Sequence, residues 1–383
     1  MARLGDYIEQ IRGVSYKPED VCASTDNDAI AILRANNIQD DGLNFDDLVY
    51  VNKSKISDKQ YIKKGDIIVC ASSGSKSLVG KAAIASENLP IAFGAFCKVV
   101  RPKKLIPRYI GYFFQSPKYR STISELSGGA NINNIRNEHI DELDIVIVSE
   151  KEQESIVNQL DALSKLIVLR KQQLSKLDEL IKSRFVELFG DPETNPKGLE
   201  KVLLSDIAEY FNGLTYSPDN VADDGIIVLR SSNIQNSQLD FSDTVRVDCL
   251  IKEKLYVKNN DILMCSRNGS ARLVGKVALI KNLSEPMTFG AFMMIIRSKY
   301  YPYLMTYFQM DAFRRQIATG VTTTINQITG NMLNKISLPL PDMADINEFA
   351  AFVEQTDKSK LVIQQSLEKL ETLKKSLMQQ YFG

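Results

Sequence analysis

The sequence has little of the side-chain chemistry on which most enzyme sites depend. Its 383 residues include one histidine, His139, and no tryptophan. A histidine-based triad or metal cluster therefore cannot recur along the chain. There is no phosphate-binding G-x-x-x-x-G-K-S/T sequence, no G-x-G-x-x-G after a predicted strand and no H-E-x-x-H. We expect no catalytic residues and no metal site in this chain, and we interpret His139 as a surface or strand-edge residue.

Cysteines and long apolar runs are also scarce. The five cysteines are odd in number, widely spaced and without a C-x-x-C pair, which argues against a disulfide framework and against a zinc site. The first residues lack the apolar core of a signal peptide. No apolar run approaches the roughly 18 residues that cross a membrane. We therefore expect a soluble protein of the reducing cytoplasm that contacts no membrane.

Neither sign of charge is in excess, because 47 lysines and arginines stand against 47 aspartates and glutamates. This balance argues against a protein that coats nucleic acid without selectivity. It leaves open a protein that gathers its basic side chains on one face. The apolar fraction of 44% and the charged fraction of 25% are typical of a soluble globular protein, and the length allows two or three domains.

What the sequence does contain is an internal duplication. Residues 62–81 align without a gap to residues 257–276 and match at ten of the twenty positions. Two shorter sequences also recur: L-R-x-x-N-I-Q begins at Leu33 and at Leu229, and F-G-A-F follows later in each half. Each copy must form the same kind of unit. We therefore expect two equivalent globular units.

Within each globular unit the periodicity is mixed. Short apolar runs that follow turn residues predict buried strands, and aromatic residues on one face predict short helices. The predicted strands are 67–70, 97–101, 143–148, 262–265 and 293–297, and the predicted helices are 108–115 and 302–310. Each unit is therefore expected to be an α/β or α+β domain.

Each globular unit leads into a stretch of about forty residues in which apolar side chains follow alternating steps of four and three. That spacing predicts a long amphipathic helix with a heptad seam, which needs a partner along its length. We expect the two helices to pair, because one small domain cannot cover such a helix; packing of each stripe onto its own unit is the alternative. The seam residues are Leu160, Leu163, Ile167, Leu174, Leu177, Ile181 and Leu188 in the first helix and Ile363, Leu367, Leu370 and Leu377 in the second.

Local signals mark the ends of the two long helices. Ser149 and Glu152 have the spacing of a capping box, and Asp342 stands where it can cap the second helix. Phe-Gly closes both helices, at Gly190 and Gly383, where glycine can adopt the left-handed conformation. The two prolines after Gly190 cannot continue a helix. The predicted boundaries are 1–149 and 200–343 for the globular units, 150–190 and 344–383 for the helices, and 191–199 for the linker.

Polar residues in predicted loops are the candidates for a binding function. Arginine suits the edge of guanine, and asparagine and glutamine suit the edge of adenine. Loops that contain glycine can bring backbone amides and basic side chains to phosphates. The candidate DNA-contacting residues are Arg34, Asn36, Asn37, Gln39, Ser73, Ser75, Lys76, Asn133 and Asn134 in the first half, and Arg230, Asn233, Gln235, Arg267, Asn268, Arg272, Thr323 and Asn326 in the second.

A structural interpretation competes for positions that are identical in both halves. Buried asparagines can satisfy backbone groups, and glycines can permit tight turns, so Asn37 and Asn233 stay open between the two roles. Positions that differ between matched loops are better candidates for specificity. Two domains that read different DNA sequences must differ in at least some of their residues. These positions are Arg267, Asn268 and Arg272, which stand opposite Ser72, Ser73 and Ser77.

The order of features along the whole chain resembles a known family. A strand-like run at 145–148 is followed by E-Q-x-x-I-V from Glu152. The step Leu-Pro-Leu-Pro at 338–341 precedes the second helix, and Phe-Gly ends both helices. Together with the duplication, these features make the chain similar to the specificity (S, HsdS) subunit of Type I restriction-modification systems.

The resemblance implies a role for each part of the chain. Each globular unit would be a target recognition domain that reads one half of a split double-stranded DNA site. The antiparallel coiled-coil helices would be the spacer of a pseudo-twofold arrangement. The helical regions would bind two modification (methyltransferase) subunits, which would supply S-adenosylmethionine, so this chain would bind no cofactor itself. Whether restriction or translocase subunits join is left open.

Two other functions are compatible with the residues. One is a coiled-coil scaffold or adaptor of a multi-subunit complex that does not bind DNA, which specific DNA binding by the complex would exclude. The other is a free-standing adenine methyltransferase, which binding of S-adenosylmethionine by the isolated chain would support. We interpret the chain as a non-catalytic DNA-specificity subunit that directs methyltransferase and restriction subunits to its site.

Overall fold

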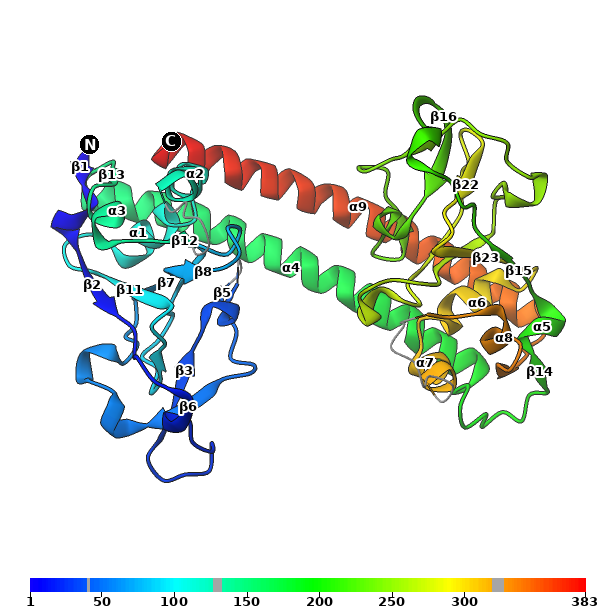
Figure 1. The fold of residues 1–383 in the computed structure, drawn as a ribbon, viewed down its shortest axis with the longest axis horizontal. Helices are drawn as coiled ribbons and strands as arrows, with labels where there is room; N and C mark the ends of the chain where they lie inside the picture. The colour runs from blue at the N-terminus through cyan, green and yellow to red at the C-terminus, as the bar shows by residue number, and fades with distance from the viewer. Residues whose placement is uncertain (40–41, 127–132, 319–326) are drawn as a thin grey trace. The chain divides into compact units, whose positions relative to one another are not determined.

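Two compact units make up the chain in the computed structural model (Figure 1). The described residues are 1–39, 42–126, 133–318 and 327–383. The first unit joins residues 1–172 to residues 364–383, and the second unit is residues 173–363. Each unit therefore holds one globular domain together with one part of each long helix.

The first domain is built around a four-stranded antiparallel sheet and a smaller three-stranded sheet. Their strands are β2 (Ile8–Arg12), β3 (Ala29–Leu33), β6 (Val49–Asn52), β7 (Ile67–Cys70), β9 (Ala82–Ile84), β10 (Ala92–Phe93) and β11 (Cys97–Pro102), in the orders β2-β11-β7-β9 and β10-β3-β6. On β11, Val100 packs with the apolar side chains of the short helices, and Val99 packs with those of the smaller sheet. Because both faces are covered, β7 is a continuous apolar run.

Short helices and strand pairs complete the first domain. The helices are α1 (Pro107–Phe113), α2 (Pro117–Leu126) and α3 (Asn137–Asp141). The antiparallel pairs are β1 (Ala2–Arg3) with β13 (Asp144–Ile145), β4 (Ile38–Gln39) with β5 (Gly42–Leu43), and β8 (Ser72–Ser73) with β12 (Asn133–Asn134). Single turns of 3-10 helix lie at Leu4–Tyr7, Pro18–Asp20, Ala35–Asn37, Lys53–Lys55 and Asp58–Gln60.

The second domain repeats this architecture. Its four-stranded sheet has the order β15 (Glu209–Asn212), β23 (Met293–Arg297), β20 (Ile262–Cys265) and β21 (Val277–Leu279), and its three-stranded sheet the order β19 (Arg246–Val247), β16 (Val221–Leu229) and β22 (Met287–Phe289). The other elements are β14 (Lys201–Leu203), β17 (Ile234–Gln235), β18 (Gln238–Leu239), β24 (Ser337–Pro339), α5 (Leu204–Ile207), α6 (Tyr301–Tyr307), α7 (Asp311–Ala318) and α8 (Gly330–Leu333), with 3-10 turns at Pro218–Asn220, Ser231–Asn233, Glu253–Leu255 and Ala271–Leu273. The repeated strand order confirms the duplication and the α+β class.

The long helices α4 (Glu150–Phe189) and α9 (Met343–Phe382) have 40 residues each. Polar contacts join them within each unit. The contacts are Gln159 with Tyr381 and Lys171 with Glu371 in the first unit, and Asp178 with Lys360 and Arg184 with Glu348 in the second. In both units a later position on α4 meets an earlier position on α9, so the helices are antiparallel. Among the described residues, no helix carries an apolar stretch that could cross a membrane.

Burial along the two long helices follows the predicted heptad seam. Every seam position of both helices is buried or half-buried, whereas Leu361 and Leu373 beside the seam are 58% and 47% exposed. The alternative interpretation also holds in part, because the helices contribute to the domain cores. Leu160 and Phe382 pack in the core of the first domain, and Phe189 packs in that of the second. The terminal phenylalanines are thus core residues as well as parts of the helix ends.

The predicted helix signals are present at the first junction. The amide of Ser149 donates to the Glu152 carboxylate at 2.9 Å, and the amide of Glu152 donates to the Ser149 hydroxyl at 3.3 Å, which completes the capping box. Gly190 has a φ of +79°, the left-handed conformation expected after a helix. Helix α9 begins directly after Asp342, whose carbonyl accepts a hydrogen bond from the amide of Ile346 at 3.1 Å.

The predicted strand at 143–148 is wrong over most of its length. Only Asp144–Ile145 is a strand, because its partner β1 is two residues long. The backbone that follows bonds to side chains instead. The carbonyl of Val146 accepts a hydrogen bond from the Tyr109 hydroxyl at 2.8 Å, and that of Val148 accepts one from the Gln153 amide at 3.0 Å. Apolar and polar side chains alternate in this segment as they do in a hydrogen-bonded β-strand, so the alternation alone could not distinguish the two.

Candidate nucleic-acid interface

The repeated turn after β3 and β16 is held together by its own asparagine. Asn37 accepts a hydrogen bond from the backbone amide of Arg34 at 2.8 Å and donates one to the carbonyl of Asp46 at 2.7 Å. Asn233 accepts the equivalent bond from Arg230 and donates to two carbonyls. Both asparagines are 1% exposed. Their proposed contact with bases is therefore corrected to a structural role, because the backbone occupies these buried amides.

The arginines of the same turn lie at the surface in ion pairs. Arg34 Nη2 lies 2.7 Å from the Asp47 carboxylate, and Arg230 Nη2 lies 2.8 Å from the Asp243 carboxylate. The arginine side chains are 35% and 33% exposed, and the aspartates more so. Exposed ion pairs contribute about 0 to 1 kcal/mol. A phosphate or a guanine edge could therefore replace either aspartate at small cost.

The other candidates of the turn are accessible. Asn36, Gln39 and Gln235 are all exposed. The side-chain amide of Gln39 donates to the carbonyl of Asn36 at 2.7 Å, and that of Gln235 donates to the carbonyl of Ser232 at 3.0 Å. These bonds orient the two glutamines while their side chains stay at the surface, where a base edge could reach them.

The polar loop after the central strand is paired with a distant polar segment in both domains. In the first domain, Ser72–Ser73 pairs with Asn133–Asn134 in an antiparallel ladder. In the second, Arg267 forms an isolated antiparallel bridge with Gln327. The structure thereby brings together two of the polar segments that the sequence marks separately, because main-chain pairing joins them.

The remaining candidates differ in exposure. In the first domain Ser73 is half-buried, and Ser75 and Lys76 are exposed. Two candidates of the second domain, Thr323 and Asn326, lie outside the described residues. The first domain thus offers a small, polar loop surface with one cation.

The second domain presents different side chains on the equivalent loop. Arg267 and Arg272 are exposed, and within the described part of the chain neither forms an ion pair. Asn268 is half-buried, and its amide donates to the hydroxyl of Ser231 at 3.3 Å. That bond ties the polar loop to the turn that contains Arg230. The two cations are therefore available to an anion or to a base edge.

A tight turn connects these segments, and its apolar sequence does not predict a binding role. It is the repeated F-G-A-F segment. The carbonyl of Phe96 accepts hydrogen bonds from the amides of Ala71 and Ser72 at 2.9 and 3.1 Å, and the amide of Gly94 donates to the carbonyl of Leu33 at 2.9 Å. The second domain has the same bonds. We call the joined segments the recognition face: 34–39, 72–77, 94–96 and 133–134 in the first domain, and 230–235, 267–272, 290–292 and 327 in the second.

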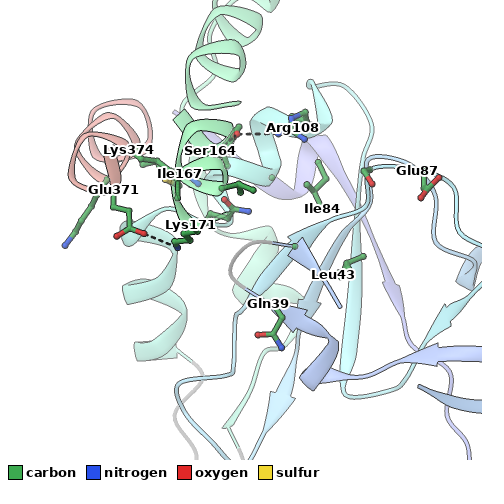
Figure 2. Close-up of a pocket in the computed structure, with 18 of the residues that line it drawn as sticks. Gln39, Leu43, Ile84, Glu87, Arg108, Ser164, Ile167, Lys171, Glu371 and Lys374 are labelled. Atoms are coloured by element: carbon green, nitrogen blue, oxygen red, sulfur yellow. Dashed lines mark hydrogen bonds and ion pairs between the residues drawn. The ribbon is translucent and has the colours of Figure 1, made fainter. Parts of the chain in front are cut away.

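A cavity of about 840 Å³ lies within the first unit, between strands β4 and β5, helix α1 and the adjoining segments of α4 and α9 (Figure 2). Two ion pairs lie at its wall: Arg108 with Asp161, and Lys171 with Glu371 at 3.0 Å. Burial lowers the pKa of Lys374, and the nearby Lys171 and Arg108 act in the same direction. Among the described lining residues, the Tyr112 hydroxyl donates a hydrogen bond to the Asp161 carboxylate at 2.5 Å and lies 3.3 Å from the Ser164 hydroxyl.

Three of the cysteines are buried, and their pKa values and that of the single histidine are shifted. Burial raises the pKa of the Cys97 thiol to about 12, and burial also raises the pKa of Cys70 and Cys265. Burial and the neighbouring Arg136 lower the pKa of His139. Within the described ranges, no group of three or more histidine, cysteine, aspartate or glutamate side chains could hold a metal ion.

Two copies of one α+β domain, each with a polar recognition face and each joined to antiparallel helices, define a class of duplicated recognition protein. The family follows from comparison with known sequences. A model of the Type I restriction modification DNA specificity domain matches residues 1–179 and again residues 196–372. The chain therefore belongs to the family of Type I restriction-modification DNA specificity proteins.

Individual relatives agree with this family. The chain is 31% identical to the EcoKI specificity subunit of Escherichia coli (strain K12) and 30% identical to the StySPI specificity subunit of Salmonella potsdam, both of Type I restriction enzymes. Both alignments cover 97% of this chain and 86% of the relative. A crystal structure of the S subunit of a Type I restriction-modification system from M. genitalium has a similar fold, with a TM-score of 0.56 at 14% identity over 100% of this chain and 95% of that one. The predicted resemblance is confirmed.

Proposed function

We propose that each domain reads one half of a split double-stranded DNA site and that the chain directs methyltransferase subunits to that site. The supporting observation is a pair of recognition faces with the same backbone frame and different side chains. Where the first domain has Ser72 and Ser73, the second has Arg267 and Asn268 on a loop anchored by the same hydrogen bonds. Two domains that read different half-sites need the same backbone conformation and different side chains where they contact the bases.

The recognition face combines groups for both kinds of DNA contact. The exposed Lys76 and Arg272 flank the polar loops and suit phosphates, which position a protein without reading sequence. Arg267 and Asn268 begin the second loop, next to the F-G-A-F turn, and suit the edges of guanine and adenine. Gathering cations locally also reconciles DNA binding with an overall net charge of zero.

The long helices provide a surface for partner subunits. Several apolar side chains remain exposed along them although the seam is covered, which is a usual feature of a protein-binding surface. They are Leu166, Val168, Leu169 and Leu373 in the first unit and Leu180, Val186, Leu361 and Val362 in the second. We propose that two modification subunits bind along the helices and supply S-adenosylmethionine and the methyl transfer, and that this chain contributes no catalytic group. Recruitment of a restriction subunit would follow from the same docking.

The test is a base-resolved map of adenine methylation in cells with and without the gene for this chain. Loss of one motif, consisting of two short half-sites across a fixed gap, is the expected result. A chain that carries Arg267→Ala and Arg272→Ala together should retain methylation that depends on the first half-site sequence while relaxing the second. An unchanged methylation map, with the chain and its methyltransferase partners expressed, would contradict the proposal and favour the scaffold function.

A further inference from the structure

The F-G-A-F segment places one phenylalanine in the core and the other in solvent in both domains. Phe93 and Phe289 are 0% exposed, whereas Phe96 and Phe292 are 68% and 57% exposed. Single exposed apolar side chains are common on protein surfaces. Here, however, the same ring is exposed at the equivalent point of two copies whose adjoining loops have different residues. A role shared by both copies accounts for this better than chance exposure.

Each exposed ring stands on a rigid turn. The carbonyl of Phe292 accepts hydrogen bonds from the amides of Ser266 and Arg267 at 2.9 and 3.1 Å. On the other side of the turn, a Cβ added to Gly213 would lie 2.1 Å from the carbonyl oxygen of Gly290, so the backbones are in close contact. The first domain has the same hydrogen bonds and the same close approach. An aromatic side chain on such a turn loses little conformational entropy when it binds.

In the second domain the exposed ring lies beside groups that could read bases. The Arg267 guanidinium lies over the Phe292 ring, 5.3 Å from its centroid. A Cβ added to Gly290 would be 4.0 Å from Cγ of Arg230, which places the arginine turn on the other side. The ring is therefore an apolar group against one cationic side chain, on a turn whose glycine approaches a second arginine. Nucleobases combine apolar faces or methyl groups with polar edges and neighbouring phosphates, so they match this arrangement.

From these contacts we infer that Phe96 and Phe292 contact DNA, each placing its ring against the apolar surface of a base in its own half-site. The inference rests on the proposed function, because it requires the two recognition faces to read DNA. It adds a contact residue to each face at a point where both domains have the same side chain. The rings supply contact area and orientation, while the differing loop residues beside them select the sequence.

The test uses the full chain assembled with its methyltransferase subunits and duplex DNA carrying the motif found by methylation mapping. Two further duplexes have one or the other half-site scrambled. Phe96→Ala and Phe292→Ala should each weaken binding to the intact site about 10- to 100-fold, and each loss should disappear on the duplex whose matching half-site is scrambled. Phe96→Tyr and Phe292→Tyr keep the ring and should keep most of the affinity. Leu250→Ala is the control for loss of an exposed apolar side chain, because Leu250 is 95% exposed.

Two readouts identify the apolar surface. Replacing a thymine by deoxyuridine removes its methyl group, and at a methyl contact this change should abolish the further effect of the alanine variant. A 2-aminopurine at a stacked position should change its fluorescence on binding of the wild-type complex and less on binding of the alanine variant.

Three results would overturn the inference. One is wild-type affinity in both alanine variants while the wild-type complex discriminates the motif from scrambled DNA. Another is a loss that comes from weaker binding of the methyltransferase subunits. The third is a wild-type complex that does not discriminate at all, which would remove the proposed function and this inference with it. The wild-type measurement therefore separates the two failures.

Discussion

Asp66 and Arg101 form a bidentate ion pair in the first domain. Arg101 Nε and Nη2 each donate to a different carboxylate oxygen of Asp66 at 2.7 Å, and the aspartate side chain is 1% exposed. The amide of Lys63 donates to the same carboxylate at 2.8 Å. Asp261 and Arg297 repeat the arrangement in the second domain, at 2.7 and 2.6 Å. The pair fastens the turn before the buried strand to the neighbouring central strand in both copies.

Breaking this pair should destabilise the first domain strongly. Asp66→Asn leaves the partly buried guanidinium of Arg101 without its counter-ion, and we expect a loss of about 3 to 5 kcal/mol in unfolding free energy by urea titration. The control is Glu9→Gln, which removes an exposed pair with Lys59 at 3.3 Å and should cost less than about 1 kcal/mol. Similar small losses in both variants would show that the Asp66 carboxylate is not an essential partner.

A buried lysine should make the stability of the first domain depend on pH. Lys98 is 5% exposed, and its ammonium donates to side-chain oxygens of Gln10 at 2.8 Å and Asn137 at 2.6 Å. Burial lowers its pKa to about 8, although Asp141 and Glu138 oppose the change. In the unfolded chain the lysine has its ordinary pKa near 10.5. Between these values the unfolded state binds more protons, so stability rises with pH.

Lys98→Met removes this dependence, and the equivalent position of the second domain is already Met294. We expect the stability of wild type relative to the variant to increase by on the order of 1 kcal/mol as pH rises from about 7 to about 10. Urea unfolding of both proteins across this range measures the change. A difference that stays constant with pH would mean that Lys98 keeps an ordinary pKa in the folded protein.

Two glycines of the first domain should respond differently to alanine. Gly65 has a φ of +88°, and an added Cβ would lie 2.9 Å from Cβ of Pro107. Gly65→Ala should therefore cost about 1 to 2 kcal/mol through backbone strain and this contact. Gly74 lies in the recognition face with nothing within 4 Å of an added Cβ, so Gly74→Ala should change stability by less than about 0.5 kcal/mol. Thermal unfolding compares the two, and equal shifts would contradict the assigned strain.

The features that were predictable from the sequence are those that repeat or follow a short period. The duplication gave two equivalent domains, and the heptad spacing identified the seam from Leu160 onwards, because a helix with this pattern must bury the same stripe along its length. Strands such as Ile67–Cys70 were predictable because a strand covered on both faces is continuously apolar. The capping box at Ser149 depends on residues three apart, so it was also visible locally.

The features that could not be predicted depend on contacts between residues that are far apart in the sequence. Nothing in the local pattern showed that Asn37 turns inwards to bond Asp46 or that Arg34 is paired with Asp47. Main-chain pairing also joins the polar loop to the segment at 133–134, which no spacing in the sequence encodes. In the sequence the F-G-A-F turn is visible only as a repeat, although its second phenylalanine is exposed in both domains. An exposed apolar residue kept in both copies was the available signal.

The two exposed arginines of the second recognition face should separate base reading from phosphate binding. Arg267 lies over the exposed Phe292 ring, so Arg267→Ala should reduce affinity about tenfold or more and relax discrimination at one half-site only. Arg272, at the edge of the loop, suits a phosphate, so Arg272→Ala should weaken binding to all sequences and lower the slope of log affinity against log salt by about 1. Ser72→Ala, at the position equivalent to Arg267, is the matched control for the other domain and should leave the second half-site unaffected. Titrations of the assembled complex at several salt concentrations, with each half-site scrambled in turn, give both readouts. Equal losses at both half-sites from Arg267→Ala would show that this arginine does not read a base in one half-site.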